Sequence, residues 1–343
     1  MKDQIDQLCK KYNLGNLKEE PAVITGGLLH KMYRVETDQR EYAVKVLNPD
    51  IMKRPDALQN MIHSEQVSNQ LKEIVPLVAA RDFNGKHVLE EDGQFFIVYD
   101  WLDGSSVFVP EISEYHCEQI GRILGKIHAA DIKIKNVEKE RDSRHVYNWD
   151  FYLKKAKEQE AGWQNSDTQK LVVLFENELP RIVRWDKQVA ECQPEVFNFQ
   201  VISHRDLDPK NVMWMDNEPY IIDWEAAGYM NPYQELVEVL NYWIVDAEGK
   251  YDDKKFQALM SAYTERMDIN CVNWDVVLKC SFDGMLGWLE YNVKRALGLE
   301  GSNEDRQEGS KQVAETIVEL KRYEEQIEVL RHRIVEFIDT KYV

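Results

Sequence analysis

Four polar residues late in the sequence have the types and spacing that phosphoryl transfer needs. His204, Asp206 and Asn211 lie close together, and Asp223 follows the apolar stretch 220–222. Transfer of a phosphoryl group needs a base that accepts the proton of the attacking hydroxyl, and cations that neutralise the phosphate oxygens. Asp206 can be that base, and the oxygens of Asn211 and Asp223 can bind Mg²⁺. His204 is better suited to orienting this catalytic segment than to exchanging protons.

A predicted β-hairpin brings two of these groups together. The turn 216–219 separates the strand-like runs 212–215 and 220–222. Because a hairpin places the outer ends of its two strands side by side, Asn211 and Asp223 are expected at the same end. The competing interpretation is an ordinary hairpin with acidic turn residues, since Asp and Asn are common wherever chains bend. The combined spacing favours the chemical interpretation.

Residues suited to the phosphates of a nucleotide occur earlier in the sequence. Gly26 and Gly27 form a turn between two predicted strands, where backbone amides can approach phosphate without a Cβ in the way. Lys45 stands in an otherwise apolar strand, so its ammonium needs an anion, and Glu65 on the following helix can supply one. In a nucleotide site Lys45 would hold the phosphates and Glu65 would orient it. The alternative is a strand-edge lysine that reaches water.

The segment 96–104 is an apolar strand that runs into a bend ending in Gly104. Backbone groups of such a bend can hydrogen-bond a purine base, although it can also be a plain linker. We assign the following residues of this segment to the nucleotide site: Tyr99, Asp100, Trp101 and Leu102. The sequence has no Walker A pattern, which disfavours the P-loop NTPases.

The elements that must position these residues change in character along the chain. A short amphipathic helix precedes β-type runs at 22–25, 32–36, 41–47, 87–90 and 94–99, and a helix at 55–72 interrupts them. These runs predict a five-stranded antiparallel sheet plus a helix. From Ser113, which can cap a helix, the pattern is mostly helical. We therefore predict an α+β, bilobal fold with an N-terminal nucleotide-binding lobe at 1–98, a hinge at 99–104, and a larger, mainly helical C-terminal lobe at 105–343.

Composition and charge narrow the classes of protein further. Hydrophobic residues make up 43% of the chain and charged residues 30%, as in ordered globular proteins. The formal charge of -18 opposes binding to nucleic acids and anionic membranes and would favour a cationic ligand, although it can also simply aid solubility. No apolar run approaches the roughly 20 residues of a membrane span, and the start lacks a signal-peptide pattern, so we expect a cytoplasmic protein. The five scattered cysteines indicate neither disulfides nor zinc.

Together these motifs resemble the aminoglycoside phosphotransferase and choline kinase family, which has a protein-kinase-like fold. The resemblance extends from about Val23 to Arg295 and rests on the segments 26–35, 120–128 and 203–225. It implies that the catalytic base is Asp206, the magnesium ligands are Asn211 and Asp223, the nucleotide lysine is Lys45, and the co-substrate is ATP or GTP.

One departure from the family pattern bears on the substrate. Arg205 stands where the family usually has Gly, and His204, Arg205, Asp206 and Asn211 fit the protein-kinase pattern H-R-D-x-x-x-x-N. A protein kinase would also need D-F-G and a long activation segment. Here Asp223 is followed by Trp and Glu, and a helical pattern begins soon afterwards at Pro232, so a peptide substrate is disfavoured.

The acceptor is predicted to bind in the helical second lobe, where the family builds its acceptor pocket in part from the insertion 147–185. The candidate residues are acidic or aromatic: Asp208, Glu225, Tyr229, Glu235, Trp288 and Glu290. Because carboxylates bind ammonium groups and aromatic faces attract cations, we expect a small cationic alcohol, aminoglycoside-like or choline-like. Two alternatives stay open: a metabolic kinase of homoserine, methylthioribose or a sugar, and a kinase-like binding or coat protein without activity. We expect a monomer.

Overall fold

The computed structural model describes residues 1–24, 29–134, 137, 139, 146–160, 166–301 and 303–341. The chain divides into two compact units, each built from two segments. Unit 1 comprises Met1–Glu138 and Val201–Tyr229, and unit 2 comprises Lys139–Gln200 and Met230–Val343. The chain therefore leaves unit 1, enters unit 2, and returns to unit 1 for the predicted catalytic segment. The division into lobes at 99–104 stays a prediction.

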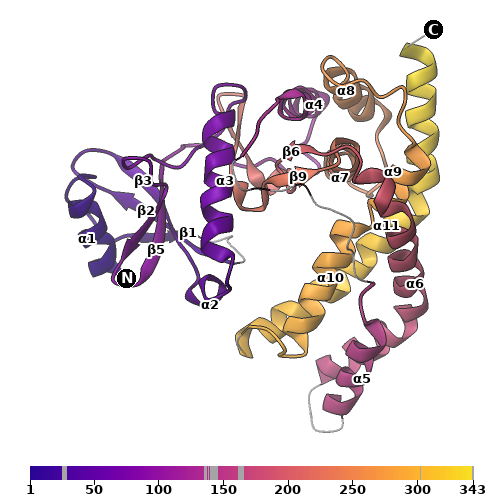
Figure 1. The fold of residues 1–343 in the computed structure, drawn as a ribbon, viewed down its shortest axis with the longest axis horizontal. Helices are drawn as coiled ribbons and strands as arrows, with labels where there is room; N and C mark the ends of the chain where they lie inside the picture. Colours follow the sequence, from indigo (N-terminus) through magenta and orange to yellow (C-terminus); the bar gives the residue numbers. More distant parts are fainter. Residues whose placement is uncertain are drawn as a thin grey trace. The chain divides into compact units, whose positions relative to one another are not determined.

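Unit 1 begins with a five-stranded antiparallel sheet in the order β1-β2-β3-β5-β4, which confirms the predicted sheet (Figure 1). Its strands are β1 (Ala22–Ile24), β2 (Lys31–Glu36), β3 (Glu41–Val46), β4 (Val88–Glu91) and β5 (Gln94–Asp100). The helix predicted at 55–72 is α3 (Ala57–Leu71), and a separate short helix, α2 (Pro49–Met52), precedes it. Asn48 caps α2 by accepting a hydrogen bond from the Asp50 N–H.

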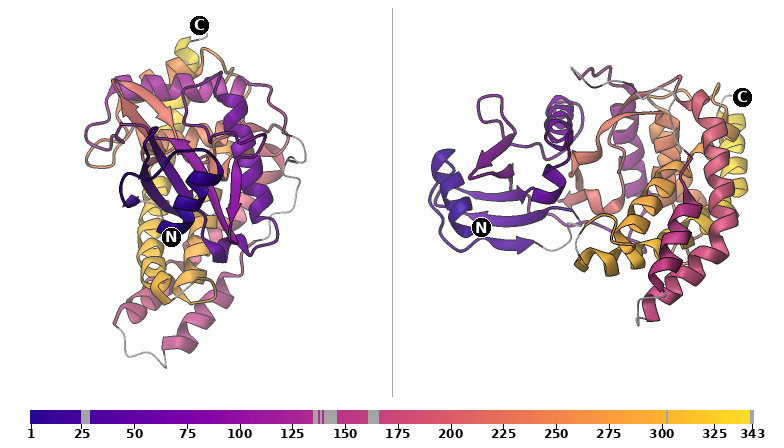
Figure 2. Two further views of the ribbon diagram at one scale, coloured as in Figure 1. Left: turned by 90° about the vertical axis from the view of Figure 1, so that its left-hand side faces the viewer. Right: turned by 60° about the horizontal axis from the view of Figure 1, so that its bottom comes forward.

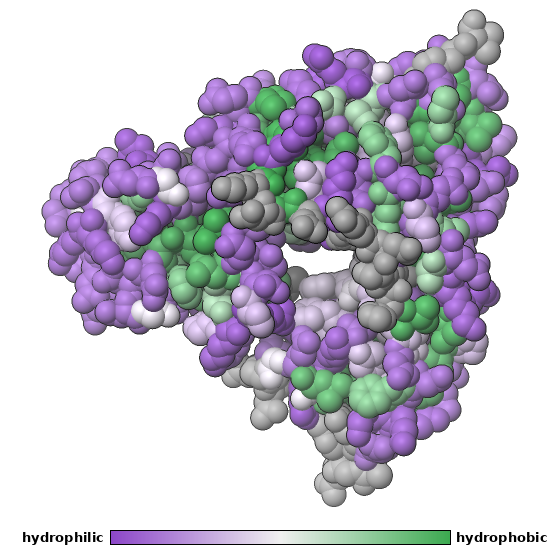
Figure 3. Space-filling view, in the orientation of Figure 1, coloured by the Kyte–Doolittle hydropathy of each residue, from purple (hydrophilic) through white to green (hydrophobic). Residues whose placement is uncertain are grey.

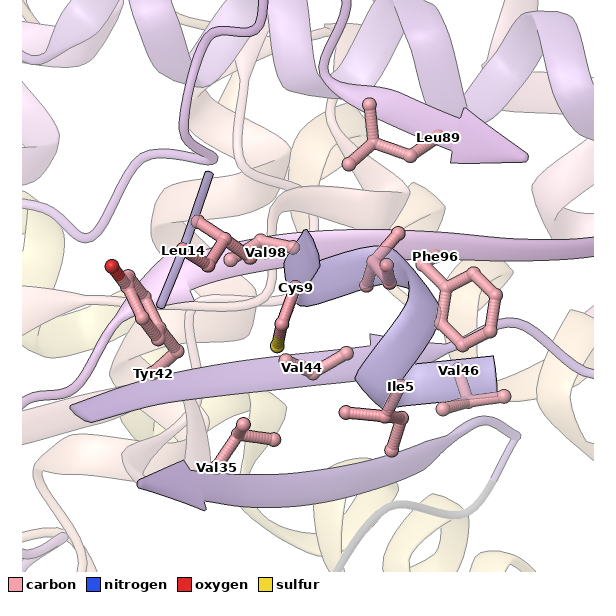
Figure 4. Close-up of a cluster of buried hydrophobic side chains, with 11 residues drawn as sticks. Ile5, Cys9, Leu14, Val35, Tyr42, Val44, Val46, Leu89, Phe96 and Val98 are labelled. Carbon is pink, nitrogen blue, oxygen red and sulfur yellow. The ribbon is translucent and has the colours of Figure 1, made fainter. Parts of the chain in front are cut away.

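The two faces of the sheet are covered by different helices. Helix α1 (Lys2–Lys11) packs on one face, where Ile5 and Cys9 point toward Val44 of β3 (Figure 4). The opposite face packs against α3 and includes Ile97 of β5. Because side chains alternate along a strand and Lys45 pairs with Ile97, the Lys45 side chain lies on the α3 face.

The predicted hairpin is also present in unit 1, but its turn comprises only residues 216–217, because Glu218 pairs with Met215 and already belongs to the second strand. It consists of β7 (Val212–Met215) and β8 (Glu218–Ile221), and the flanking β6 (Val201–Ser203) and β9 (Gly228–Met230) pair with each other. The Val78 N–H donates to the Ile221 carbonyl at 2.9 Å, and the Ile221 N–H donates to the Pro76 carbonyl at 3.1 Å. A Cβ at Gly104 would lie 2.8 Å from the Trp214 carbonyl oxygen, so glycine permits this close approach. The hairpin is thereby fixed from both of its edges.

The helical part begins as predicted with Ser113, which caps α4 (Glu114–Ala129) in unit 1. The remaining helices lie in unit 2: α5 (Trp149–Glu160), α6 (Ser166–Val196), α7 (Pro232–Trp243), α8 (Asp253–Tyr263), α9 (Trp274–Cys280), α10 (Asp283–Ala296) and α11 (Asn303–Lys341). Figure 2 shows α10 and α11 running side by side, in agreement with their extensive packing. Trp185 of α6 stacks on Phe282 at 5.6 Å, and Tyr323 of α11 meets the same ring at 4.8 Å. This aromatic cluster ties three segments of unit 2 together.

The face of the molecule in Figure 3 is mostly hydrophilic, with apolar side chains in separate small groups. In the part of the chain that the structure describes, no helix combines the length and the apolar character needed to cross a bilayer.

Candidate active site

The predicted catalytic loop, residues 204–211, is held to the neighbouring strand by His204. The imidazole is fully buried, its Nδ1 accepts the Asp206 N–H at 3.3 Å, and its Nε2 lies 3.1 Å from the Ile222 carbonyl oxygen. Since Nδ1 is an acceptor, Nε2 carries the proton and donates to that carbonyl. The ring also meets Trp224 edge-on at 4.6 Å. His204 therefore connects the loop of Asp206 to the residue directly before Asp223.

Asn211 fixes the carboxylate of Asp206. Its Nδ2 donates to the Asp206 carbonyl at 2.8 Å and to Asp206 Oδ2 at 2.9 Å. The Ile222 N–H donates to the Asn211 carbonyl at 2.9 Å, so Asn211 lies beside the Ile222–Asp223 peptide. With the amide nitrogen used in this way, the amide oxygen Oδ1 is the atom of Asn211 that can meet a cation.

Lys45 joins the sheet to this region through two carboxylates. Its Nζ lies 2.7 Å from Asp223 Oδ1 and 2.7 Å from Glu225 Oε2, and the lysine is 7% exposed. Burial alone would lower the pKa of Lys45, but the two carboxylates more than offset this and raise it. Burial would likewise raise the pKa of Asp223, but Lys45 lowers it below its ordinary value. The ammonium and the Asp223 carboxylate therefore both stay charged.

The ion pair predicted between Lys45 and Glu65 differs from the one in the structure. Glu65 is 3% exposed and accepts hydrogen bonds from the Tyr99 hydroxyl at 2.7 Å and from the Ser68 hydroxyl at 3.3 Å. The physical reason is that two other carboxylates contact the ammonium directly, while neutral donors satisfy Glu65. Burial raises the pKa of Glu65, and the charge of Lys45 opposes this only in part.

A second lysine stands beside the predicted base. Lys210 Nζ lies 3.3 Å from Asp206 Oδ1 and 2.8 Å from Asp208 Oδ2. The Asp208 side chain also accepts the Lys210 N–H at 2.6 Å, which begins the 3-10 turn η1 (Pro209–Asn211). Burial raises the pKa of Asp206, and Lys210 opposes this rise. Lys210 is one of the residues of this region to which the sequence interpretation gave no role.

Two residues of the site have left-handed backbone conformations. Arg205 has φ of 68° and Asp223 has φ of 58°. Glycine adopts this conformation without steric cost, whereas an L side chain is strained in it. The backbone thus explains why glycine suits position 205, where this chain departs from the family pattern. Strained backbone of this kind persists where surrounding contacts hold it, as His204 and Asn211 do here.

The predicted nucleotide residues are only partly described. Gly26 and Gly27 lie outside the described residues. Tyr99 belongs to β5 and its hydroxyl contacts Glu65, while the Trp101 N–H donates to the Glu41 carbonyl at 3.3 Å. The side chain of Asp100 pairs with Arg81 and Arg40. The Arg34 guanidinium stacks over the Trp101 ring at 4.6 Å. Leu102 is half-buried.

The candidate acceptor residues fall in both units. Asp208, Glu225 and Tyr229 belong to unit 1, and Glu235, Trp288 and Glu290 belong to unit 2. Lysines already contact three of these acids: Lys210 pairs with Asp208, Lys45 with Glu225, and Lys294 with Glu290 at 2.7 Å. The Tyr152 hydroxyl also donates to Glu290, the Trp288 Nε1 donates to Gln312 at 3.4 Å, and Glu235 is buried. A cationic acceptor would have to compete with lysines for these carboxylates.

His30 is a site residue that the sequence interpretation did not identify. It lies directly before β2, its Nδ1 accepts the Asn48 N–H at 2.9 Å, and its Nε2 is 3.5 Å from Glu225 Oε2. Burial is the main cause that lowers the pKa of His30 to about 4, and the charge of Lys45 is the second. The ring is therefore neutral at pH 7. No motif of the sequence singled out this histidine.

The donor set suits magnesium. Within the described ranges, no three or more His, Cys, Asp or Glu side chains gather into a group that could hold a metal ion on their own. Mg²⁺ usually binds one or two protein oxygens and completes its shell with water and substrate phosphates. Asn211 Oδ1 and the ionised Asp223 fit that requirement, because the two residues are neighbours across the hairpin end.

The fold and this geometry define the class: a two-part α+β protein with the catalytic arrangement of the kinase-like phosphotransferases. Residues 21–269 match the phosphotransferase enzyme family, and the chain belongs to that family, as its motifs predicted. A homoserine kinase of Parvibaculum lavamentivorans is 26% identical over 170 residues, which cover 49% of this chain and 48% of that protein. The chain therefore spans about half the length of this curated relative.

Two solved structures support the fold assignment. A spectinomycin phosphotransferase in complex with ADP and spectinomycin has a TM-score of 0.70 at 15% identity, and covers 94% of this chain and 98% of its own. Choline kinase from Cryptosporidium parvum has a TM-score of 0.55 at 15% identity, with 95% and 96% covered. The predicted fold class is confirmed.

Proposed function

We propose that this protein is a magnesium-dependent phosphotransferase that moves the γ-phosphate of ATP or GTP to the hydroxyl of a small molecule. The observation that carries the proposal is the bonded arrangement of Asp206 with Asn211, next to Asp223 and Lys45. It supplies a base, two metal-binding oxygens and a phosphate-binding cation within one unit. A non-catalytic binding or coat protein has no chemical need for all four of these residues.

The reaction assigns a task to each group. Asp206 accepts the proton of the acceptor hydroxyl at Oδ1, because the contact of Oδ1 with Lys210 Nζ, at 3.3 Å, is longer than the 2.9 Å bond of Oδ2 with Asn211. The acceptor oxygen forms a bond to the γ-phosphorus while the bond from that phosphorus to the β–γ bridging oxygen breaks, and ADP or GDP leaves. Lys45 holds the phosphates, and Asn211 and Asp223 would hold Mg²⁺, which neutralises phosphate charge. His204 positions the loop through its bonds to Asp206 and Ile222.

The acceptor we favour is a small amino alcohol. Homoserine and choline, named for two of the similar proteins, each carry a hydroxyl and a cationic nitrogen. Lysines already contact Asp208, Glu225 and Glu290, so a highly charged polycation would have to displace them to pair with these carboxylates. The name of the curated relative makes homoserine the first specific candidate. We further propose a cytoplasmic monomer without nucleic-acid or membrane partners; the charge of -18 supports the absence of these anionic partners.

The test is ADP release in the presence of Mg²⁺ across homoserine, choline, ethanolamine, methylthioribose and spectinomycin, with ATP and GTP compared. For the acceptor that turns over, Asp206→Asn should lower kcat by about 10²- to 10⁴-fold, the usual contribution of a positioned base. The affinity for the nucleotide should change little. Asp131→Asn is the matched control, because that side chain is 87% exposed and should retain full activity.

Two results would contradict the proposal. Full turnover by Asp206→Asn would remove Asp206 as the base. Binding of MgATP without phosphorylation of any acceptor in a broad set of alcohols would favour the binding protein.

A further inference from the structure

His30 lies buried against the charged centre of unit 1. The side chain is 2% exposed, and its Nε2 approaches the Glu225 carboxylate. The same Glu225 oxygen contacts Lys45 Nζ at 2.7 Å, and that ammonium contacts Asp223 Oδ1 at 2.7 Å. The Met32–Lys45 pairing of β2 with β3 explains this location, because His30 directly precedes β2. A buried imidazole thus adjoins the proposed phosphate lysine and the proposed metal ligand.

The hydrogen bond of Nδ1 determines the state of the ring. Nδ1 accepts the Asn48 N–H at 2.9 Å and therefore carries no proton. A neutral imidazole then has its proton on Nε2, which is a donor. Among the residues that the structure describes, Nε2 has no hydrogen-bond partner, and its 3.5 Å approach to Glu225 Oε2 does not make one. A buried donor without an acceptor is unfavourable, so this N–H calls for an explanation.

We propose that the Nε2–H of His30 donates to a phosphate oxygen of the bound nucleotide, an inference that rests on the proposed phosphotransferase function. The acceptor must be anionic or strongly polar, because the Glu225 oxygen that Nε2 approaches at 3.5 Å is itself 2.7 Å from the Lys45 ammonium. A phosphate oxygen meets this requirement. Lys45 attracts phosphate by charge, whereas a neutral imidazole fixed by Asn48 contributes direction. His30 is therefore a binding residue for the phosphate chain and makes no contact with the purine.

The experiment is calorimetric titration of the purified full-length protein with MgADP and, separately, with adenosine. His30→Asn should weaken MgADP binding about tenfold or more and leave adenosine within about twofold, since a hydrogen bond to a charged group is lost. The asparagine oxygen can still accept the Asn48 N–H, so thermal stability without ligand should be retained. His30→Gln, whose amide N–H reaches farther, should recover part of the affinity. His63→Asn on α3 is the control and should bind both ligands like the wild type.

A second measurement uses the wild-type chain. In protein labelled with ¹⁵N-histidine, the Nε2–H signal of His30, assigned by its loss in His30→Gln, should shift on addition of MgADP and stay unchanged with adenosine. Wild-type MgADP affinity in His30→Asn, or an unshifted signal, overturns the inference and leaves the proposed function intact. Equal weakening of MgADP binding and adenosine binding also overturns the inference, because the substitution would then disturb the whole nucleotide site. A wild-type protein that binds no MgADP overturns the inference together with the proposed function.

Discussion

At the scale of the residue, Glu65 is a buried carboxylate whose hydrogen bonds come from neutral donors. Burial raises its pKa above the ordinary value of 4.5, so the folded protein releases this proton at higher pH than the unfolded chain does. The contribution of Glu65 to stability is therefore fully present below about pH 4.5 and is lost as pH rises through the folded pKa. The hydroxyls of Tyr99 and Ser68 donate to this carboxylate, which opposes the rise of its pKa.

The variant Glu65→Gln tests the predicted direction in which stability changes with pH. The glutamine oxygen can still accept the Tyr99 hydroxyl, but it cannot ionise, so the variant should lose less stability than the wild type between pH 4.5 and pH 8. The measurement is the thermal midpoint of both proteins across that range. Glu73→Gln, a change to an exposed acid just beyond α3, is the control and should follow the wild type. Parallel curves for Glu65→Gln and wild type would contradict the raised pKa.

Glu65 also shows which contacts could not be predicted from the sequence. Residue types and spacing were enough to single out Lys45, Glu65 and Asp223 as charged groups near one centre. They were not enough to say which carboxylate the lysine contacts, because Asp223 and Glu225 come from a segment about 180 residues away. His30 was missed for a similar reason. A histidine beside a glycine turn carries no pattern of its own, and only the bond from Asn48 reveals its tautomer.

At the scale of the element, the hairpin of β7 and β8 was predictable because both strands and the turn have strong local signals. The turn residues Asp216 and Asn217 have φ of 52° and 65°, the left-handed pair that a two-residue type I′ turn requires. The left-handed φ values of Arg205 and Asp223 had no such signal. Tertiary bonds impose them, through His204 and Asn211, so they could be recognised only in the structure.

The turn gives a prediction about stability. Asn217→Ala should destabilise the protein by about 1 kcal/mol, because alanine tolerates the left-handed conformation less well than asparagine. Asn217→Gly should be neutral or stabilising by up to about 0.5 kcal/mol, since glycine adopts this conformation freely. The bond from the Tyr115 hydroxyl goes to the backbone carbonyl of Asn217 and is available in both variants. Urea unfolding measures the two differences, and equal stability of the alanine and glycine variants would contradict the turn type.

At the scale of the whole molecule, the sequence did not predict which segments of the chain make up each unit. Unit 1 is assembled from Met1–Glu138 and Val201–Tyr229, with Lys139–Gln200 in unit 2. Local patterns assign a helix or a strand to each stretch, but membership of a unit depends on contacts between distant segments. Two backbone hydrogen bonds are such contacts: the Val78 N–H donates to the Ile221 carbonyl, and the Ile221 N–H donates to the Pro76 carbonyl. They join the segment after α3 to the hairpin that precedes Asp223, and so build the candidate site from both parts of unit 1.

The composition of unit 1 predicts which segments nucleotide binding should protect from hydrogen exchange. All the described groups that we propose for phosphate and metal binding lie in unit 1, in both of its segments. Binding at 100 times Kd stabilises the native state by about 2.7 kcal/mol. Hydrogen exchange with and without MgADP should therefore slow in β2, β3 and the loop 204–211 together, although residues 139–200 separate these segments in the sequence. In Asp223→Asn the fold should persist and the magnesium-dependent part of the protection should disappear. Protection confined to residues 31–100 would contradict the proposed role of the catalytic loop, because Asn211 and Asp223 would then take no part in holding the nucleotide.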